Sequence, residues 1–508
     1  MLRILPYKIF FLLIVCTGPF CSAQNKPKPL ILVHYMPWFQ TPSFHGSWGW
    51  HWTMNHYNPN SLDSSGHRSI ASHYYPLSGP YDSDDPNILE YQTLLMKISG
   101  IDGVLVDWYG NDNVFDYGTL NTSAQNIFAA IQKASLLFGI VYEDQSIKHM
   151  IDGGYFNASQ AYDHGRSALE YLENSWSGTA SYLHFDNHPV LLVFGPQYFL
   201  RSTDWDSLFS KLRTSPLFIT LDNRLTPAAV GSYPWPPMWK SNSSGILTQD
   251  VLNSYLASFY QQSAGAPYLI TSAFPGFHDI YKEAGVGESY GFLDPLNGET
   301  FSSILHLAIT HNPDVIQIAT WNDYGEGTIV EPTAEFGYQY LDTLQSVKRG
   351  LDAAFGLKEE DLQWPLQILT LRLRFAGNSE IGSALNRVYS LIVSGRRDSI
   401  NTILDSLSQI TQMPPRPVLT PRRYGLQQNY PNPFNPATVI GYQLAVGSSI
   451  TVQVYDELGR EVATLVNGEQ FAGSHSVRWD AARFPSGVYF YALNAGSYHE
   501  VKKMVLMK

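Results

Sequence analysis

Residues 85–107, DPNILEYQTLLMKISGIDGVLVD, predict the unit from which the fold is built. Asp85 followed by Pro86 is typical of a helix start, because the acid can accept hydrogen bonds from free amides and proline fits the first turn. Apolar side chains then recur at helical spacing, and the helix is expected to end at Gly100. The residues that share this apolar face are Ile88, Tyr91, Leu95 and Ile98. A short apolar strand, 104–107, follows, so the stretch predicts a helix that leads directly into a buried strand.

Six more short apolar runs lie between residues 27 and 345. They are 30–35, 139–142, 189–194, 217–221, 268–271 and 315–320. Continuous apolar runs are typical of parallel strands that are covered on both faces. Seven strands, an eighth that the pattern does not place, and the helices between them predict a (β/α)₈ TIM barrel over residues 27–345. An open doubly wound sheet is the alternative, but no glycine-rich phosphate loop follows the first strand, so a nucleotide-binding fold has little support.

The composition argues against two classes of protein. The chain has 508 residues and a formal net charge of −12, whereas a nucleic-acid binder needs a basic face to neutralise phosphates. Hydrophobic residues make up 44% and charged residues 15%, so the chain is not expected to be disordered. Aromatic residues make up 14%, which indicates a large aromatic core or a site that stacks on sugars, and composition alone favours the core.

The first 23 residues have the pattern of a signal peptide. A positively charged start is followed by an apolar run, residues 9–16, and then by small residues suited to cleavage. The run is shorter than the roughly 18 residues that a membrane span needs. Both cysteines, Cys16 and Cys21, lie in this segment, so we expect no disulfide and no thiolate metal site in the mature chain. No later run is long enough to span a bilayer, so we expect a soluble protein outside the cytoplasm.

Three segments follow the predicted barrel. Residues 346–411 have helical spacing without recognisable chemistry, so we expect a helical cap or connector. Residues 412–424 are rich in proline and predict an extended linker. Residues 425–508 alternate apolar and polar side chains between short turns, for example over 450–455 and 488–493, which predicts a small Ig-like β-sandwich.

The last predicted barrel strand runs into residues 321–327, Trp-Asn-Asp-Tyr-Gly-Glu-Gly. Reactive groups of a barrel lie at the C-terminal ends of its strands, so Asp323 and Glu326 are the candidate catalytic acids. The glycines permit a tight turn in which both acids face one cavity. Glycoside cleavage needs one protonated and one ionised carboxyl group, and aromatic walls help to raise the pKa of one of them. An exposed acidic loop is the alternative, and the local sequence leaves the two interpretations level.

The loop after the first predicted strand, about residues 36–85, is long and dense in aromatic residues. Loops of this length are usually functional or disordered, and this one is too aromatic for disorder. It is expected to form a folded lid, a wall of a sugar-binding groove, or both. Asp82, Asp84 and Asp85 could bind calcium, although helix capping already explains Asp85. No metal-ligand spacing of His or Cys occurs, so neither a metal nor a cofactor is predicted.

Several motifs resemble the glycoside hydrolase family 71/99 group, which contains endo-α-mannosidases and α-1,3-glucanases. The motifs are Tyr74-Tyr75-Pro76, Gly79-Pro80-Tyr81, Gly-Ile-Asp-Gly-Val at 100–104, Asp-Trp-Tyr-Gly at 107–110, and 321–327, and their order agrees with the family. The resemblance covers roughly residues 28–345. It implies a TIM-barrel hydrolase that acts on α-glycosidic bonds of an α-mannan or α-glucan type substrate.

By position, the resemblance implies that Asp323 and Glu326 match the two catalytic acids of the group. Asp323 would act as base, directly or on the 2-hydroxyl of the sugar, and Glu326 as acid at the glycosidic oxygen. The family 99 motif is Asn-Glu-Trp-His-Glu-Gly, so this chain departs from it at Asp323, Tyr324 and Gly325 and is closer to the family 71 form. The departures leave open which sugar is cleaved and whether its configuration is retained or inverted.

Ten residues are the predicted substrate contacts. Trp108 and Glu143 match positions at which family 99 contacts its substrate, and the others are aromatic or polar residues at strand ends or in the first loop. The ten are Tyr35, Trp38, Trp52, Tyr75, Asp107, Trp108, Glu143, Trp321, Asn322 and Tyr324. For the subsite walls among them, packing in the rim is nearly as well supported as contact with a ligand.

The C-terminal segment resembles the type IX secretion sorting domain. The resemblance rests on Tyr-Pro-Asn-Pro-Phe-Asn-Pro at 430–436, Tyr-Asp-Glu-Leu-Gly-Arg at 455–460 and Ser-Gly-Val-Tyr at 486–489. It implies export by the type IX machinery, from the periplasm across the outer membrane, to the cell surface or the medium. A carbohydrate-binding sandwich is the competing interpretation of this segment. For the whole chain, a catalytically inactive glycan-binding barrel is the alternative to an enzyme.

Overall fold

The computed structural model describes residues 28–63, 66–222, 225, 227–410, 424–429, 431–444, 448–470, 473–496 and 498–508. The predicted signal peptide, 1–23, lies outside the described residues, and so does the predicted linker, 412–424, except for its last residue. In the part of the chain that is described, no helix has both the length and the apolar character needed to cross a membrane.

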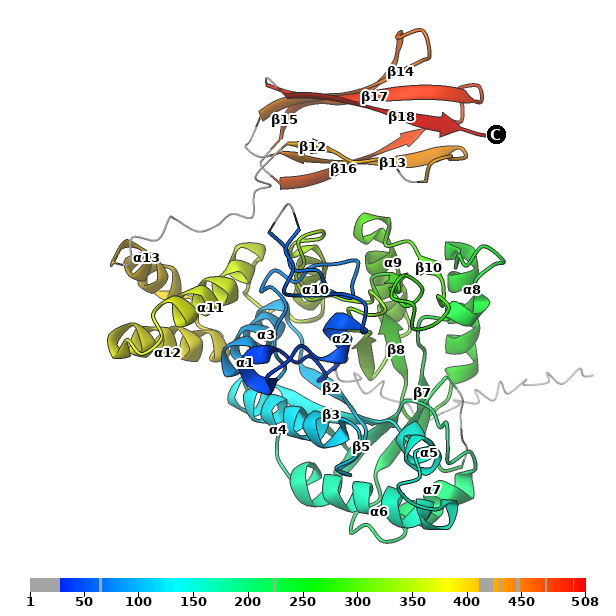
Figure 1. Ribbon diagram of the computed structural model, residues 1–508, viewed down its shortest axis with the longest axis vertical. Helices are drawn as coiled ribbons and strands as arrows, with labels where there is room; N and C mark the ends of the chain where they lie inside the picture. Colours follow the sequence, from blue (N-terminus) through cyan, green and yellow to red (C-terminus); the bar gives the residue numbers. More distant parts are fainter. Residues whose placement is uncertain are drawn as a thin grey trace, which may run out of the picture.

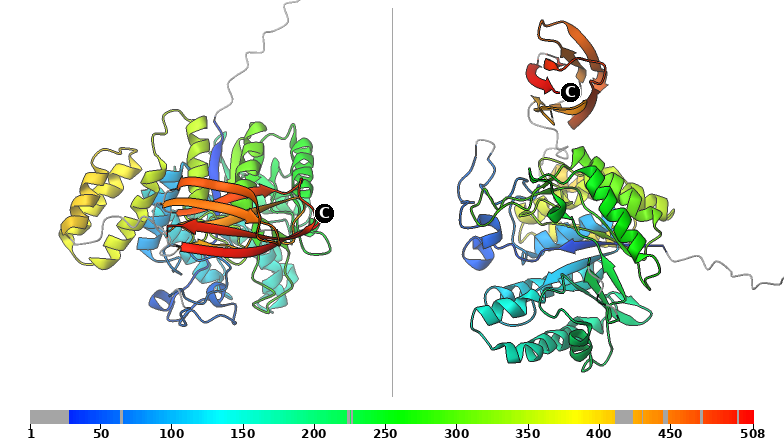
Figure 2. Two further views of the ribbon diagram at one scale, coloured as in Figure 1. Left: turned by 90° about the horizontal axis from the view of Figure 1, so that it is seen from above. Right: turned by 90° about the vertical axis from the view of Figure 1, so that its right-hand side faces the viewer.

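Eight parallel strands form a nearly closed barrel surrounded by helices (Figure 1), which confirms the predicted TIM-barrel fold. In the order of neighbours in the sheet, they are β7 (Gly231–Tyr233), β6 (Leu217–Leu221), β5 (His188–Val193), β3 (Leu137–Tyr142), β2 (Gly103–Trp108), β1 (Leu30–Tyr35), β11 (Val315–Ile318) and β8 (Ile270–Ala273). β1 pairs with both β2 and β11, so the first and last barrel strands are neighbours. Figure 2 shows the barrel and its helices from two further sides. A short strand, β4 (His184–Phe185), adds to β5 in antiparallel orientation.

β7 is the eighth strand, which the apolar pattern did not place. Its sequence, Gly-Ser-Tyr, has only three residues and no apolar run. A Cβ atom on Gly231 would lie 2.8 Å from the backbone oxygen of Tyr268, which shortly precedes β8. Glycine therefore lets the two backbones approach, and the barrel closes by this approach because no ladder joins β7 to β8 among the described residues.

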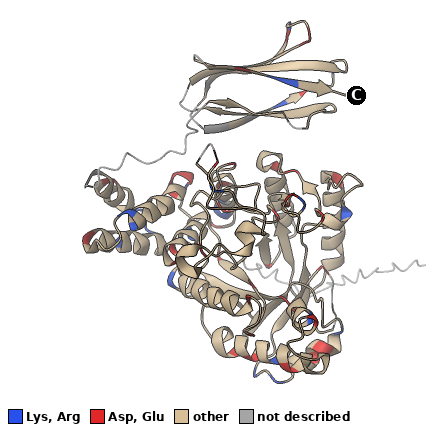
Figure 3. Ribbon diagram, viewed as in Figure 1, with Lys and Arg blue, Asp and Glu red and all other residues tan. Residues whose placement is uncertain are grey.

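The helices form the outer layer of the barrel. They are α3 (Pro86–Ser99), α4 (Tyr117–Lys133), α6 (Ala161–Leu172), α7 (Ser202–Phe209), α8 (Gln249–Ser263), α9 (Glu299–Thr310) and α10 (Gln339–Leu351). α3 begins and ends as predicted: Asn87 N donates to Asp85 Oδ1 at 2.8 Å, and Gly100 closes the helix with a φ of 83°. Lysine and arginine are scattered over the outer helices rather than gathered on one element (Figure 3).

Shorter elements lie in the connections. They are the helices α1 (Pro42–His45), α2 (Trp50–Thr53) and α5 (Gln145–Asp152), the turns η1 (Ala158–Gln160), η2 (Glu173–Ser177), η3 (Met238–Lys240) and η4 (Leu296–Gly298), and the paired strands β9 (Phe277–His278) and β10 (Phe292–Leu293).

Side chains of the barrel strands alternate between two cores. One core fills the barrel interior and includes Leu32, Leu105, Val141, Leu192, Ile219 and Val315. The other lies between the strands and the helices and includes Ile31, Val33, Val104, Val106, Ile140 and Leu191. The alternation follows from the two-residue repeat of a β-strand, and it determines which residues at the strand ends point inward.

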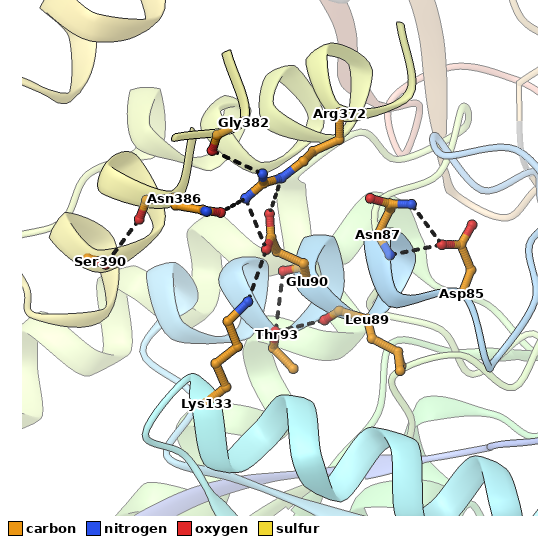
Figure 4. A network of polar contacts seen from close by, with 10 residues as sticks. All are labelled: Asp85, Asn87, Leu89, Glu90, Thr93, Lys133, Arg372, Gly382, Asn386 and Ser390. Carbon is orange, nitrogen blue, oxygen red and sulfur yellow. Dashed lines mark hydrogen bonds and ion pairs between the residues drawn. The ribbon is translucent and has the colours of Figure 1, made fainter. Parts of the chain in front are cut away.

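A helical unit follows the barrel and consists of η5 (Glu359–Gln363), α11 (Trp364–Arg374), α12 (Ser379–Val393) and α13 (Ile400–Ile410). Figure 4 shows its attachment to α3: Arg372 Nε donates to Glu90 Oε1 at 3.0 Å. Lys133 Nζ of α4 donates to Oε2 of the same carboxylate at 3.4 Å. Beside this network, a cavity of about 410 Å³ is lined by α3, α4 and Tyr389 of α12. This cavity lies in the outer helical layer.

The C-terminal segment contains two antiparallel sheets, as expected for an Ig-like sandwich. One sheet has the order β12 (Gly425–Leu426), β13 (Ala437–Leu444), β16 (Gly473–Asp480), and the other has the order β15 (Glu461–Gln470), β14 (Ser448–Tyr455), β17 (Gly487–Ala495), β18 (Tyr498–Leu506). Side chains from both sheets, among them Ile440, Val452, Trp479 and Tyr491, form one buried core.

Candidate active site

The loop after β11 is closed at its base by backbone hydrogen bonds. Thr320 N donates to Thr328 O at 2.6 Å, and Trp321 N donates to His34 O at the end of β1, also at 2.6 Å. Gly327 has a φ of 71°, and a side chain there would collide with the backbone of β9. Residues 321–327 therefore form a tight loop fixed to the barrel.

Asp323 and Glu326 lie together in this loop. Glu326 N donates to Asp323 Oδ1 at 3.0 Å, and Asp323 N donates to Thr320 Oγ1 at 2.8 Å. Asp323 is only 5% exposed and Glu326 is half-buried. This burial does not fit the alternative of an exposed acidic loop.

The two acids are electrostatically unequal. Burial raises the pKa of Asp323 to about 7, while the backbone N–H groups of Gly325 and Glu326 act in the opposite direction. Burial, followed by the negative charges of Asp323 and Asp279, raises the pKa of Glu326 well above its usual range. Amide donors thus favour the ionised form of Asp323, whereas each of the effects on Glu326 favours its protonated form.

Two further acids approach this pair from neighbouring strand ends. Asp107 ends the inward-facing side of β2, and Glu143 directly follows β3; both are buried. Burial raises the pKa of Glu143, and the charges of Asp107, Asp144 and Glu326 raise it further. The charge of Asp107 also raises the pKa of Asp323. Four carboxyl groups from three strand ends therefore share one electrostatic environment, in which they cannot all be ionised at low cost.

His34 of β1 lies at the floor of this cluster. Its Nε2 is 3.7 Å from Asp107 Oδ1, which is too long for a hydrogen bond. The ring is fully buried and packs edge-on against Trp235, with the ring centroids 5.0 Å apart. Both ring nitrogens of His34 and Asp107 Oδ1 have no hydrogen-bond partner among the described residues. Buried polar atoms without partners are rare, so these atoms are suited to form hydrogen bonds with hydroxyl groups of a ligand.

Tyr35 and Trp108 are sequence neighbours of His34 and Asp107 but point through the barrel wall toward the helices. Tyr35 OH donates to Gln92 of α3 at 2.8 Å, and Trp108 Nε1 donates to a side chain of α4 at 3.0 Å. Both side chains are fully buried. The expectation that they contact a substrate is therefore corrected, because strand alternation directs them away from the site.

A buried network around Glu331 supports the loop from below. Glu331 Oε1 accepts from Gln92 Nε2 at 2.7 Å, and its Oε2 accepts from Tyr81 OH at 2.9 Å and from Tyr324 OH at 3.0 Å. Asn322 Nδ2 donates to Tyr81 OH at 3.0 Å and to the backbone of the first loop. Burial raises the pKa of Glu331 to about 7, against the effect of these donors.

Four predicted contact residues belong to this support rather than to an open surface. Trp52, Trp321, Asn322 and Tyr324 are fully buried, and Trp52 Nε1 donates to Tyr81 O at 2.8 Å. As they are placed, they pack beneath the loop, and direct contact with a substrate stays a prediction for them. Their effect is to fix the loop that carries the two acids.

Trp38 and Tyr75 remain partly exposed and belong to the first loop. The ring of Trp38 stacks on His51 with centroids 4.3 Å apart, and that of Tyr75 stacks on His67 with centroids 4.0 Å apart. The long first loop is therefore a folded, aromatic cover, and these two residues stay candidates for substrate contact.

Two side chains near the acids were not identified from the sequence. Trp235 follows β7, and that strand has no apolar run to mark it. Tyr281, from the loop after β8, lies close to the acids: a Cβ atom on Gly325 would be 3.5 Å from its hydroxyl oxygen. Burial raises the pKa of Tyr281, and the charges of Glu326 and Asp323 raise it further. No local pattern distinguishes Tyr281 from the other tyrosines of the chain.

The acidic cluster of the first loop is made differently from the prediction. His45 joins Asp82 and Asp84, with Nδ1 at 3.0 Å from Asp82 Oδ2 and Nε2 at 3.3 Å from Asp84 Oδ2. Asp85 caps α3 instead. The three groups are close enough to ligate a metal, but the imidazole already lies between the two carboxylates, and Thr41 donates to Asp82 as well.

Much of the chain is similar to proteins named as mannosidases. A Mus musculus glycoprotein endo-alpha-1,2-mannosidase-like protein is 25% identical over 371 residues, which cover 64% of this chain and 76% of that protein. The Mus musculus glycoprotein endo-alpha-1,2-mannosidase is 24% identical over 350 residues, covering 61% and 69%. These relatives confirm the resemblance predicted from the motifs and agree with the prediction of a glycoside hydrolase.

A solved structure and a family model also match parts of the chain. The structure of the GH99 endo-alpha-mannosidase from Bacteroides thetaiotaomicron aligns with a TM-score of 0.47 and 21% identity, covering 64% of this chain and 98% of that one. Residues 428–507 match the family described as secretion system C-terminal sorting domain. The C-terminal segment is therefore a sorting domain, as its motifs predicted.

Proposed function

We propose that residues 27–345 form a glycoside hydrolase that cleaves α-glycosidic bonds of an α-mannan or α-glucan type glycan by paired-carboxylate catalysis. The observation that carries the proposal is the pair Asp323 and Glu326, which one tight loop holds at the strand ends and whose environments favour different protonation states. The names of the relatives support an α-mannosidic substrate.

Glu326 is assigned the role of general acid. Its environment favours the protonated form, so it can hold a proton at neutral pH and donate it to the glycosidic oxygen. The bond between that oxygen and the anomeric carbon then breaks, and the leaving sugar departs with a neutral hydroxyl group.

Asp323 is assigned the role of base. Its backbone donors favour the carboxylate, which removes a proton either from an attacking water molecule or from the 2-hydroxyl of the sugar. The first route inverts the anomeric configuration, and the second forms an epoxide that water later opens, which retains it. Asp107, Glu143 and His34 would then meet hydroxyl groups of the sugar at the cleavage site.

The sorting domain adds the location of this activity. Residues 425–508 would direct the chain to the type IX machinery after a signal peptide, 1–23, has brought it to the periplasm, and residues 412–424 would link the two parts. The expected location is the cell surface or the medium, where polymeric glycans are accessible.

The test is a panel of polysaccharides that includes α-mannan and α-1,3-glucan, with released reducing ends measured and the anomers of the products followed by NMR. Glu326→Gln and Asp323→Asn are each expected to lower kcat by about 10²- to 10⁴-fold while the fold is kept. Glu170→Gln, an exposed acid near the end of α6, is the matched control and should leave kcat unchanged. Full activity in either loop variant would remove that residue from the mechanism.

A glycan-binding barrel without catalysis is the second candidate, favoured by the shorter acid at position 323 and by the sorting domain. Binding to members of the panel without release of any product would establish it in place of the hydrolase.

A further inference from the structure

We infer that Phe115 and Tyr155 form an outer sugar-stacking subsite, so that the barrel binds glycan chains that extend beyond the four carboxyl groups. The inference rests on the proposed function and names its substrate class as an extended neutral glycan. It concerns the loops after β2 and β3, for which the sequence offered no contact beyond Glu143.

A row of aromatic rings leads from the acids to the outside of the protein. Tyr109 comes two residues after Asp107, and its ring stacks on Tyr117 with centroids 5.3 Å apart and planes 22° apart. Tyr117 meets the ring of Phe115 at 5.4 Å, and Phe115 meets Tyr155 at 5.0 Å. The rings of this row are therefore in contact from the strand end to its outer pair.

The outer end of the row is exposed, unlike its inner part. Tyr117 is 5% exposed, whereas Phe115 is 56% and Tyr155 is 53% exposed. A single exposed ring needs no explanation, whereas exposed rings that cluster, as these two do, are typical of interaction sites. Tyr and Phe rings suit sugars because a ring face can cover the apolar C–H face of a pyranose.

The backbone under the pair is adapted to hold it. Phe115 has a φ of 51°, a region that bulky side chains rarely adopt. A Cβ atom on Gly153 would lie 3.0 Å from Phe115 Cζ and 3.0 Å from Tyr155 Cε2, so the two rings occupy space that glycine leaves. Strained backbone of this kind persists where the surrounding structure fixes it, and such positions cluster at functional sites.

Polar groups beside the row match the hydroxyl groups of a neutral sugar. Tyr117 OH lies 3.3 Å from His149 Nδ1, and Gln145 Nε2 lies 3.0 Å from His149 Nε2. His149 is exposed, so its neighbours can exchange these contacts for bonds to a ligand. Asp116, next to Phe115, is negatively charged when ionised, which disfavours an anionic glycan.

The experiment compares the wild-type chain with the double variant Phe115→Ala/Tyr155→Ala on a graded length series of α-linked manno- and gluco-oligosaccharides. We expect KM for the longest substrates to rise about tenfold with kcat little changed, and both constants for the shortest cleaved substrate to stay as in the wild type. Tyr155→Phe keeps the ring and should behave as the wild type. Leu373→Ala removes an apolar side chain on α11 that is also 56% exposed, and should have no effect.

An unchanged KM for the longest substrate, or an equal rise for every length, would overturn the subsite while leaving the hydrolase intact. If the wild type cleaves nothing, the hydrolase itself fails, and calorimetric titration of the same series decides the subsite separately. A loss of binding in the double variant that grows with chain length would support it, and equal binding by both proteins, or binding by neither, would overturn it.

Discussion

Two buried carboxyl groups at the same end of the barrel, Glu331 and Asp107, differ in how fully their oxygens are paired. Three side-chain donors reach Glu331, from Gln92, Tyr81 and Tyr324. Asp107 Oδ1 has no hydrogen-bond partner among the described residues, and neither has the ring of His34 beside it. A buried polar atom left unpaired costs about 1–3 kcal/mol, whereas a fully paired network rigidifies its surroundings. The fully paired carboxyl group therefore fixes the loop, and we expect Asp107, with one oxygen lacking a hydrogen bond to the described residues, to meet the ligand.

The largest effect is expected at the paired group. Glu331→Ala leaves three buried donors without an acceptor, so the free energy of unfolding should fall by about 3 kcal/mol or more. Chemical denaturation measures it, with Glu170→Ala as the matched exposed control, which should change the free energy of unfolding by less than about 0.5 kcal/mol. A Glu331→Ala protein as stable as the control would show that the network does not support the loop.

A substitution of Asp107 should do the opposite: it should lower activity and leave stability intact. Asp107→Asn removes a carboxylate placed to bind substrate, so kcat/KM should fall by about 100-fold. The free energy of unfolding should stay the same or rise, because a buried acid is replaced by a neutral group of the same shape. Steady-state kinetics beside denaturation test this, and a stable, fully active variant would exclude Asp107 from the site.

The pKa of Asp323 predicts a moderate dependence on pH. Its folded-state pKa of about 7 is above the ordinary value of 3.8, so between these values the folded chain keeps a proton that the unfolded chain has lost. Its contribution to stability is therefore present at low pH and is lost as pH rises toward about 7. Between about pH 4 and about pH 8, the midpoint temperature of thermal unfolding should therefore fall less steeply with pH in Asp323→Asn than in the wild type. Activity should decline below about pH 7, where the base becomes protonated.

The smallest effect is expected at Trp108, whose side chain lies on the outer face of the barrel wall. Trp108→Phe loses the hydrogen bond to Asn121 and some packing, so the free energy of unfolding should fall by about 1 kcal/mol. Because the side chain points toward α4, kcat/KM should stay within about threefold of the wild type. A large loss of activity without loss of stability would mean that Trp108 contacts the substrate after all.

The barrel and the loop with Asp323 and Glu326 could be predicted from the sequence because each has a local signal. Apolar runs mark seven strands, and the motif after the last one places two acids near two glycines. β7 has no such signal, because its three residues are recognised as a strand only by pairing with β6. Trp235 was missed for the same reason: without a predicted strand before it, nothing in the sequence placed Trp235 at a strand end.

The direction of side chains at the strand ends was harder to predict than their position. His34 and Tyr35 both end β1, but only the structure shows which of them faces the interior. The prediction named the aromatic residue, Tyr35, as a substrate contact, but the side chain that faces inward is that of His34. The same reversal occurs at Asp107 and Trp108, because aromatic character does not report the phase of a strand.

The junction between β7 and β8 affects how the whole barrel can move. Strand neighbours elsewhere share hydrogen-bonded ladders, whereas this junction depends on the closeness of Gly231 to Tyr268. Amide protons of β7 on that side should exchange with deuterium sooner than those of β1, which is paired on both edges. The ring of Trp235, two residues past β7, packs against that of His34 with centroids 5.0 Å apart, so we expect loosening of this junction to reach the base of the acid cluster.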